Sequence, residues 1–149
     1  MQYWLMKCEP SAYSIDDLAR DKTSSWEGVR NYQVRNFMRT MQVGDKAFFY
    51  HSNATPSGVA GLMEIAKTAY PDPFATQENH KYFDPKATVE NPIWLSVDVR
   101  FIAKAREVIS IQRLREIPEL ADLMILQRGS RLSITRVTAT EFGIIKGHF

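Results

Sequence analysis

The chain has 149 residues, of which 44% are hydrophobic and 24% are charged. This composition is typical of a globular protein, taken here as one domain over residues 1–149, and it excludes a disordered tail or a coiled coil. The net charge of +2 is too small to identify a nucleic-acid partner by itself, because dedicated nucleic-acid-binding domains often have a pI above about 9.

The N-terminal residues predict a strand followed by a short helix. Residues 2–8 are mostly apolar or aromatic and are soon followed by Pro10, which favours a short strand over a helix. Ser14 and Asp17 have the spacing of a capping box, in which each side chain accepts a hydrogen bond from the other residue's backbone. We therefore expect a short helix over residues 15–20.

The segment 26–41 contains a second predicted helix with one apolar face. That face consists of residues at positions i, i+3, i+4 and i+7, namely Val34, Phe37, Met38 and Met41. Gly44 and Asp45 end this helical segment, because such a pair favours a turn. The aromatic residues of 46–52 then predict a strand.

The middle of the chain predicts two further strands separated by a long loop. Residues 58–68 form the first of them, and Gly58 and Gly61 within it indicate a bulge or a close approach of another backbone. Residues 69–92 contain four of the seven prolines and predict a long loop, either a lid or a simple surface excursion. Residues 94–102 alternate apolar and polar side chains, as a half-buried strand does.

The last forty residues predict short helices and one more strand. We expect helices over 111–116 and 119–126, a strand over 131–137, and a final helix from Thr138 to Gly147. A serine cap, a proline near the first turn or a second capping box marks each helix start. Because strands outnumber helices and their connections are irregular, the expected fold class is α+β, with a mixed, partly closed sheet and small helices at its ends.

The cysteine count and the N-terminus bear on the cellular compartment. A single cysteine, Cys8, cannot form an internal disulfide, which favours the cytoplasm. No apolar run approaches the roughly 18 residues of a membrane span, and the first ten residues lack the layout of a secretion signal. We therefore expect a cytoplasmic protein that does not enter a membrane, and a monomer is favoured.

No motif of the sequence requires a metal or a cofactor. The three histidines, His51, His80 and His148, are too scattered to indicate a metal site, and paired-cysteine and HExxH spacings are absent. Glycine-rich loops that cradle phosphates or dinucleotides are absent as well. We therefore expect neither a metal nor a cofactor.

Two segments, residues 26–32 and 48–53, combine aromatic rings with polar side chains. A pocket for one extruded nucleobase needs both, because a flat ring stacks on the base and polar groups read its edge. Each stack is worth roughly 1–3 kcal/mol, so such rings could hold a base without catalysis. The alternative is that these rings belong to an ordinary hydrophobic core.

Several strings, in order over essentially the whole chain, resemble the EVE domain family. They are WLMKCEP at 4–10, WEGVRNYQ at 26–33, FYHS at 49–52, YPDP at 70–73, YFDPK at 82–86 and RLS at 131–133. The resemblance implies a PUA-like fold, which is a pseudo-barrel of mixed strands flanked by short helices. It also implies kinship with YTH readers of methylated adenine, and a non-catalytic reader whose partner is DNA with a modified cytosine or RNA with a modified base.

The same resemblance implies which residues hold the base and which contact phosphate. The base-binding residues expected from the matching motifs are Lys7, Cys8, Trp26, Val29, Arg30, Asn31, Tyr32, His51, Ser52, Asn53, Arg131, Leu132 and Ser133. Trp26 is expected to stack on the base, and Asn31, Ser52 or Asn53 to read its edge. The phosphate contacts are expected from Arg30, Arg35 and Arg39, in a stretch without acidic residues. Most relatives have serine where this chain has Cys8, and a thiol is the weaker hydrogen-bond donor.

Two other function classes stay open at the level of sequence. The first is an enzyme acting on a nucleotide or RNA, with His51 as base and Glu9, Glu27 or Cys8 as its partner. The second is a protein-interaction module in which the aromatic residues only form the core. A cavity beside Trp26 would separate the reader from the interaction module.

Overall fold

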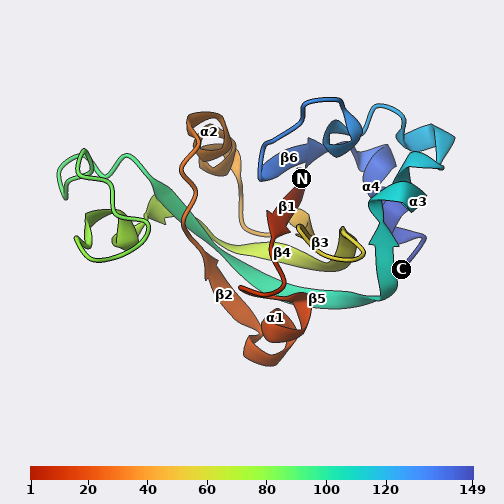
Figure 1. Cartoon of the computed structure of the whole chain (residues 1–149), viewed down its shortest axis with the longest axis horizontal. Helices are drawn as coiled ribbons and strands as arrows, with labels where there is room; N and C mark the ends of the chain where they lie inside the picture. The colour runs from red at the N-terminus through yellow and green to blue at the C-terminus, as the bar shows by residue number, and fades with distance from the viewer.

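A computed structural model describes residues 1–149 and contains one six-stranded sheet with short helices packed around it (Figure 1). The strands are β1 (Tyr3–Cys8), β2 (Thr23–Trp26), β3 (Lys46–His51), β4 (Gly58–Pro71), β5 (Leu95–Ser110) and β6 (Ile134–Val137). The α-helices are α1 (Ile15–Asp21), α2 (Tyr32–Thr40), α3 (Ile111–Arg115) and α4 (Ala139–Lys146). The structure also contains three short 3-10 helices, which are η1 (Pro73–Thr76), η2 (Pro118–Leu120) and η3 (Met124–Leu126).

The sheet has the order β2-β5-β4-β3-β1-β6. Only β1 and β3 pair in parallel, and the other neighbours are antiparallel. This mixed sheet with short helices confirms the expected α+β class. The sheet is not closed, because its two end strands β2 and β6 do not pair with each other.

Alternating side chains of the central strands fill two cores, one on each face of the sheet. In β1, Trp4 and Met6 pack with α1 and α2, whereas Leu5 packs with α3 and α4. In β3, Phe49 lies in the first core and Phe48 in the second. Because both faces are covered, these strands are apolar at successive positions.

The helix starts follow the capping residues that the sequence indicates. Ser14 and Thr138 each form a complete capping box at the start of α1 and α4. Ser110 caps α3, as expected, and Asn31 caps α2. None of the helices combines the length and apolar character that crossing a bilayer requires.

Strand β2 was not expected from the sequence. Its residues are mostly polar and alternate between exposed and half-buried positions, so they carry no apolar pattern. The strand forms at the edge of the sheet through antiparallel pairing with β5, where Ser24 lies opposite Val99. Trp26 therefore ends a strand, and it does not stand at the start of a helix.

The expected helix over 119–126 is wrong, since this segment contains the separate 3-10 turns η2 and η3. The buried residues Leu114, Ile117, Leu120 and Leu123 are spaced by three. That spacing matches the three-residue period of a 3-10 helix better than the α-helical period. Successive bonds from Leu120 N to Ile117 O and from Leu123 N to Leu120 O follow it.

The strands and the long loop also have different limits from those expected. β4 and β5 are longer than predicted and pair with each other over most of their length, and the loop between them covers residues 72–94 where 69–92 was expected. Residues 131–133 lie before β6, although Ser133 O accepts a hydrogen bond from Lys7 N at 2.8 Å.

The segment 72–94, which connects β4 to β5, projects at one end of the molecule, opposite α3 and α4 (Figure 1). It has a small core of its own, formed by Ala75, Ala87 and Trp94.

Candidate functional site

A pocket of about 700 Å³ opens where the end of β1, strand β2 and the segment 74–82 meet. Eight of the residues expected at the site line it: Lys7, Cys8, Trp26, Val29, Arg30, Ser52, Arg131 and Ser133. They come from four separate stretches of the chain, so only the tertiary fold brings them together. We call this cavity the Trp26 pocket.

Trp26 stands at the last position of β2 and is half-buried. Its ring packs edge-on against Phe49, with centroids 5.6 Å apart and an interplanar angle of 79°. This contact fixes the ring from the core side, while the indole still lines the pocket. The ring is therefore not sealed in the core and is available to stack on a ligand.

The next residues connect the pocket to the 72–94 segment. Gly28 has a φ of 81°, and its N–H donates to the buried Asp72 carboxylate at 2.9 Å. A Cβ at position 28 would lie 2.6 Å from Cε2 of Tyr82, so the position needs glycine for both space and conformation. Arg30 pairs with Asp72 at 3.0 Å and donates from Nε to Tyr82 O at 3.1 Å. The wall of the pocket around Tyr82 is thus fastened to residues 28–30.

Lys7 and Cys8, at the end of β1, contribute two ionisable groups to the pocket lining. Lys7 makes no side-chain hydrogen bond or ion pair within the protein, and burial lowers the pKa of its amine. Burial and the nearby Glu9 carboxylate raise the pKa of the Cys8 thiol. The thiol is therefore protonated at neutral pH and lies 3.7 Å from the Glu9 carbonyl oxygen as a weak donor.

The other five expected base-binding residues do not line the pocket. Asn31 accepts from Val34 N at 3.0 Å as the cap of α2, and Tyr32 is exposed and packs against Trp94. Asn53 donates to Glu9 at 2.6 Å, and Leu132 packs against the first core. His51 is buried beneath the start of α1. The geometry therefore concentrates the candidate site on the eight residues that do line the cavity.

His51 is engaged in a way that bears on the enzyme alternative. Its Nε2 accepts a hydrogen bond from Ile15 N at 3.1 Å, so its lone pair is occupied. Cys8 and His51 are register partners on neighbouring strands, yet no hydrogen bond joins the two side chains. The pair of His51 and Cys8 therefore provides neither an imidazole with a free lone pair nor a thiolate.

Sequence reasoning missed several residues that line the pocket. Two are acidic and four come from the long loop: Glu9, Glu27, Phe74, His80, Lys81 and Tyr82. The acids had been considered only as partners of a catalytic histidine. Of the loop residues, only Tyr82 lies within the YFDPK string, and nothing in the spacing of the four shows which way they face.

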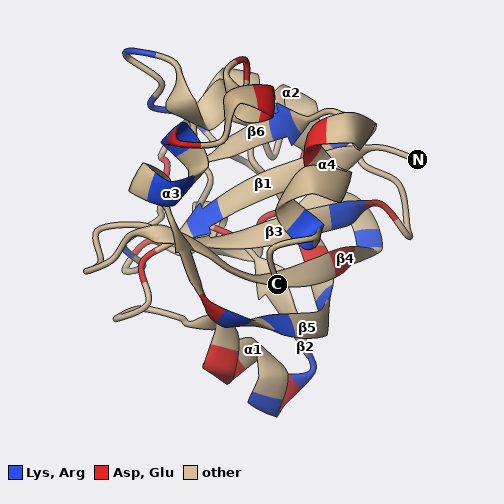
Figure 2. Ribbon diagram, turned by 90° about the vertical axis from the view of Figure 1, so that its right-hand side faces the viewer, with Lys and Arg blue, Asp and Glu red and all other residues tan.

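Arg35 and Arg39 lie on α2, outside the pocket lining. Arg35 donates to Ile93 O at 3.2 Å and lies over the Tyr32 ring at 4.9 Å. Arg39 is exposed and contacts Asn36 at 3.4 Å. Over the whole ribbon, basic and acidic residues are interspersed (Figure 2).

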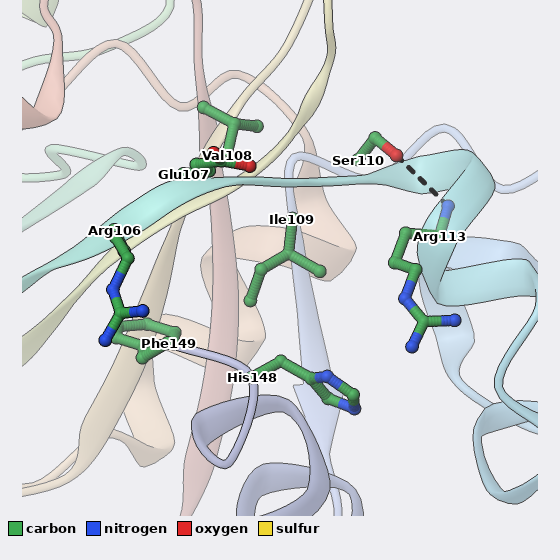
Figure 3. Close-up of a pocket in the computed structure, with 8 residues that line it drawn as sticks. All are labelled: Arg106, Glu107, Val108, Ile109, Ser110, Arg113, His148 and Phe149. Carbon is green, nitrogen blue, oxygen red and sulfur yellow. Dashed lines mark hydrogen bonds between the residues drawn. The ribbon is translucent and has the colours of Figure 1, made fainter.

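A second pocket, of about 480 Å³, lies beside the end of β5 and the C-terminus (Figure 3). Its lining includes Arg106, Ser110, Arg113 and His148, and Ser110 accepts a hydrogen bond from Arg113 N at 3.1 Å. None of the residues expected at the site from the sequence lines this pocket. The Trp26 pocket is therefore the candidate site.

Comparisons with known proteins found one matching family, and they found relatives and solved structures that cover most of this chain. The model of the EVE domain matches residues 2–147. Human thymocyte nuclear protein 1 is 39% identical over 161 residues, which cover 96% of this chain and 72% of that protein. A crystal structure of a protein from Pseudomonas syringae has a TM-score of 0.94 and 46% identity, with 97% of each chain covered. The crystal structure of human THYN1 protein in complex with 5-methylcytosine containing DNA has a TM-score of 0.92 and 38% identity, covering 99% of this chain and 96% of the other.

Proposed function

Because this chain belongs to the EVE domain family, we propose that it binds DNA containing a modified cytosine and holds the modified base in the Trp26 pocket without catalysis. The observation that carries the proposal is the half-exposed Trp26 ring beside a cavity of about 700 Å³. The complex of the human relative supplies the class of ligand.

The physical argument starts from what an extruded base needs. Its face needs an aromatic plane, and its edge needs donors and acceptors at the wall of a pocket. Trp26 supplies the plane. Lys7, Ser52, Arg131 and Ser133 line the same cavity and supply polar side chains for the edge and the neighbouring phosphate.

The two other function classes have less support. An enzyme that uses His51 as its base would need a free lone pair, and that lone pair accepts from Ile15 N. A pure interaction module would need no cavity beside Trp26. RNA with a modified base remains the second candidate ligand, and the cytoplasmic location and the monomeric state stay predictions.

The test measures binding to a DNA duplex with one 5-methylcytosine against the same duplex with cytosine. We expect the wild-type protein to prefer the methylated duplex. Trp26→Ala should lower affinity for it by about tenfold or more, because one base–aromatic stack is worth roughly 1–3 kcal/mol. Trp26→Phe should retain part of the affinity, since a smaller ring still stacks.

Phe149→Ala is the matched control, because Phe149 is a half-buried aromatic residue that lines the second pocket, away from the Trp26 pocket. It should bind as the wild type does. Circular dichroism checks that each variant is folded. A folded Trp26→Ala variant with wild-type affinity would remove the stacking role, and stronger binding to a 5-methylcytidine RNA would move the proposal from DNA to RNA.

A further inference from the structure

Glu27 places a partly unused carboxylate in the Trp26 pocket. It follows Trp26 directly, is half-buried and forms no ion pair. The Ser25 hydroxyl donates to Oε2 at 2.5 Å and so holds the carboxylate in place. The other oxygen, Oε1, has no hydrogen-bond partner within the protein, which leaves an acceptor for a ligand in the same cavity.

Lys7 provides the complementary group. Lys7 lines the same pocket, and its ammonium also lacks a hydrogen bond or an ion pair within the protein. Burial lowers the pKa of this amine. No ion pair joins Glu27 and Lys7, so the pocket presents a separate acceptor and a separate donor.

This pair matches the edge of cytosine and mismatches that of thymine. Cytosine has a donor, the N4 amino group, beside its acceptors N3 and O2. Thymine has an acceptor, O4, at the corresponding position and a donor at N3. A carboxylate accepts from the cytosine amino group, but it meets a carbonyl oxygen in thymine. Because 5-methylcytosine and thymine share the same ring and methyl group, only this edge separates them.

We propose that Glu27 is the residue that selects a 4-amino pyrimidine, by accepting a hydrogen bond from the N4 amino group of the base that Trp26 stacks on. Lys7 donates to the acceptor side of the same base. The inference rests on the proposed function, since it needs a base in the Trp26 pocket. It adds the chemical feature by which that pocket distinguishes 5-methylcytosine from thymine.

The experiment compares two single-stranded DNA oligonucleotides that differ only in one base, 5-methylcytosine or thymine. Single strands are used so that base-pairing energy does not enter the comparison. We expect the wild-type protein to bind the 5-methylcytosine strand about tenfold more tightly or better, which is the usual range for one well-formed edge contact. Glu27→Gln should bring the two affinities to within about threefold, because an amide presents either a donor or an acceptor.

Glu78→Gln is the matched control, because Glu78 is an exposed carboxylate on the 72–94 segment and lies outside the pocket lining. It removes the same charge and should raise affinity for both strands equally through the phosphates. If Glu27→Gln behaves in the same way and keeps the wild-type ratio, the proposal is overturned. Equal wild-type affinity for the two strands would overturn it as well.

Ser25→Ala provides a second variant with no change of charge. It removes the hydrogen bond that holds Glu27, so the ratio of the two affinities should fall several-fold while circular dichroism stays unchanged. An unchanged ratio in this variant contradicts the role of the Ser25–Glu27 pair. A wild-type protein that binds neither these strands nor the methylated duplex contradicts the proposed function itself, whereas discrimination that survives Glu27→Gln contradicts only the role of Glu27.

Discussion

His51 shows how one buried polar side chain can support local structure near a candidate site. Its Nε2 accepts from Ile15 N at the start of α1, where helical N–H groups lack partners within the helix. Burial lowers the pKa of this histidine from its ordinary value of 6.5; Asp16 opposes the shift, and Lys104 adds to it. The neutral imidazole is therefore the form that the fold requires.

We expect the free energy of unfolding to decrease as the pH falls below about 6.5. In that range the unfolded chain, whose histidine has its ordinary pKa, binds a proton that the folded chain does not, so protonation favours unfolding. His51→Gln should remove most of this dependence, since its side-chain oxygen can accept from Ile15 N without titrating. Urea unfolding of the wild type and of His51→Gln at pH 7.5 and pH 5.5 measures the free energy of unfolding of each protein at both pH values. An equal decrease in wild type and variant would assign the effect to other groups.

At the scale of elements, the 72–94 segment depends on one buried carboxylate. Asp72 accepts from Gly28 N, from Phe74 N and from the Arg30 guanidinium, each at 2.9–3.0 Å. Within the segment, Trp94 donates to Asp84 at 2.7 Å. The wall of the Trp26 pocket therefore depends on hydrogen bonds more than on a large apolar core.

Asp72→Asn should destabilise the protein by about 2 kcal/mol. Asparagine has one side-chain oxygen for three donors, and Arg30 would lose its ionic partner in a half-buried place. Amide hydrogen exchange should become faster over residues 73–94 than in the central strands. Asp122→Asn, at an exposed position, is the control and should change neither quantity. Unchanged exchange in Asp72→Asn would show that other contacts hold the segment.

At the scale of the whole molecule, electrostatic attraction to DNA depends on where charges lie. The chain has 19 basic and 17 acidic residues, and these are interspersed over the surface (Figure 2). Helix α2, which follows the pocket wall directly, contains no acidic residue and carries Arg35 and Arg39. This helix is therefore the proposed contact for the phosphates beside the bound base.

Arg39→Ala should weaken binding of methylated and unmethylated DNA by the same factor. It should also reduce the slope of log affinity against log salt by about 1, because one phosphate contact is lost. Arg39 suits this test since its only side-chain contact within the protein is with Asn36. Arg106→Ala, at the second pocket, is the control (Figure 3). An unchanged salt slope in Arg39→Ala would exclude this arginine from the interface.

Local sequence determined most helices and five of the six strands. Capping boxes at Ser14 and Thr138, and the apolar stripe of α2, act between residues three or four positions apart, so they can be identified without a fold. The central strands were identified from runs of apolar and aromatic residues, which are also a local feature of the sequence. The quoted strings also identified the EVE family, and the expected membership is confirmed.

Only the tertiary structure decided the limits of the long strands, the existence of β2 and the composition of the pocket. Strand β2 is mostly polar and forms because its backbone pairs with that of β5. No local sequence pattern predicts this pairing. Likewise, Trp26, Lys7, Glu27 and Tyr82 share a cavity because distant segments meet there. Short-range hydrogen bonds and hydrophobic periodicity depend on residues that are close together in the chain. The direction of a side chain at a loop or a sheet edge depends instead on contacts with residues that are distant in the chain.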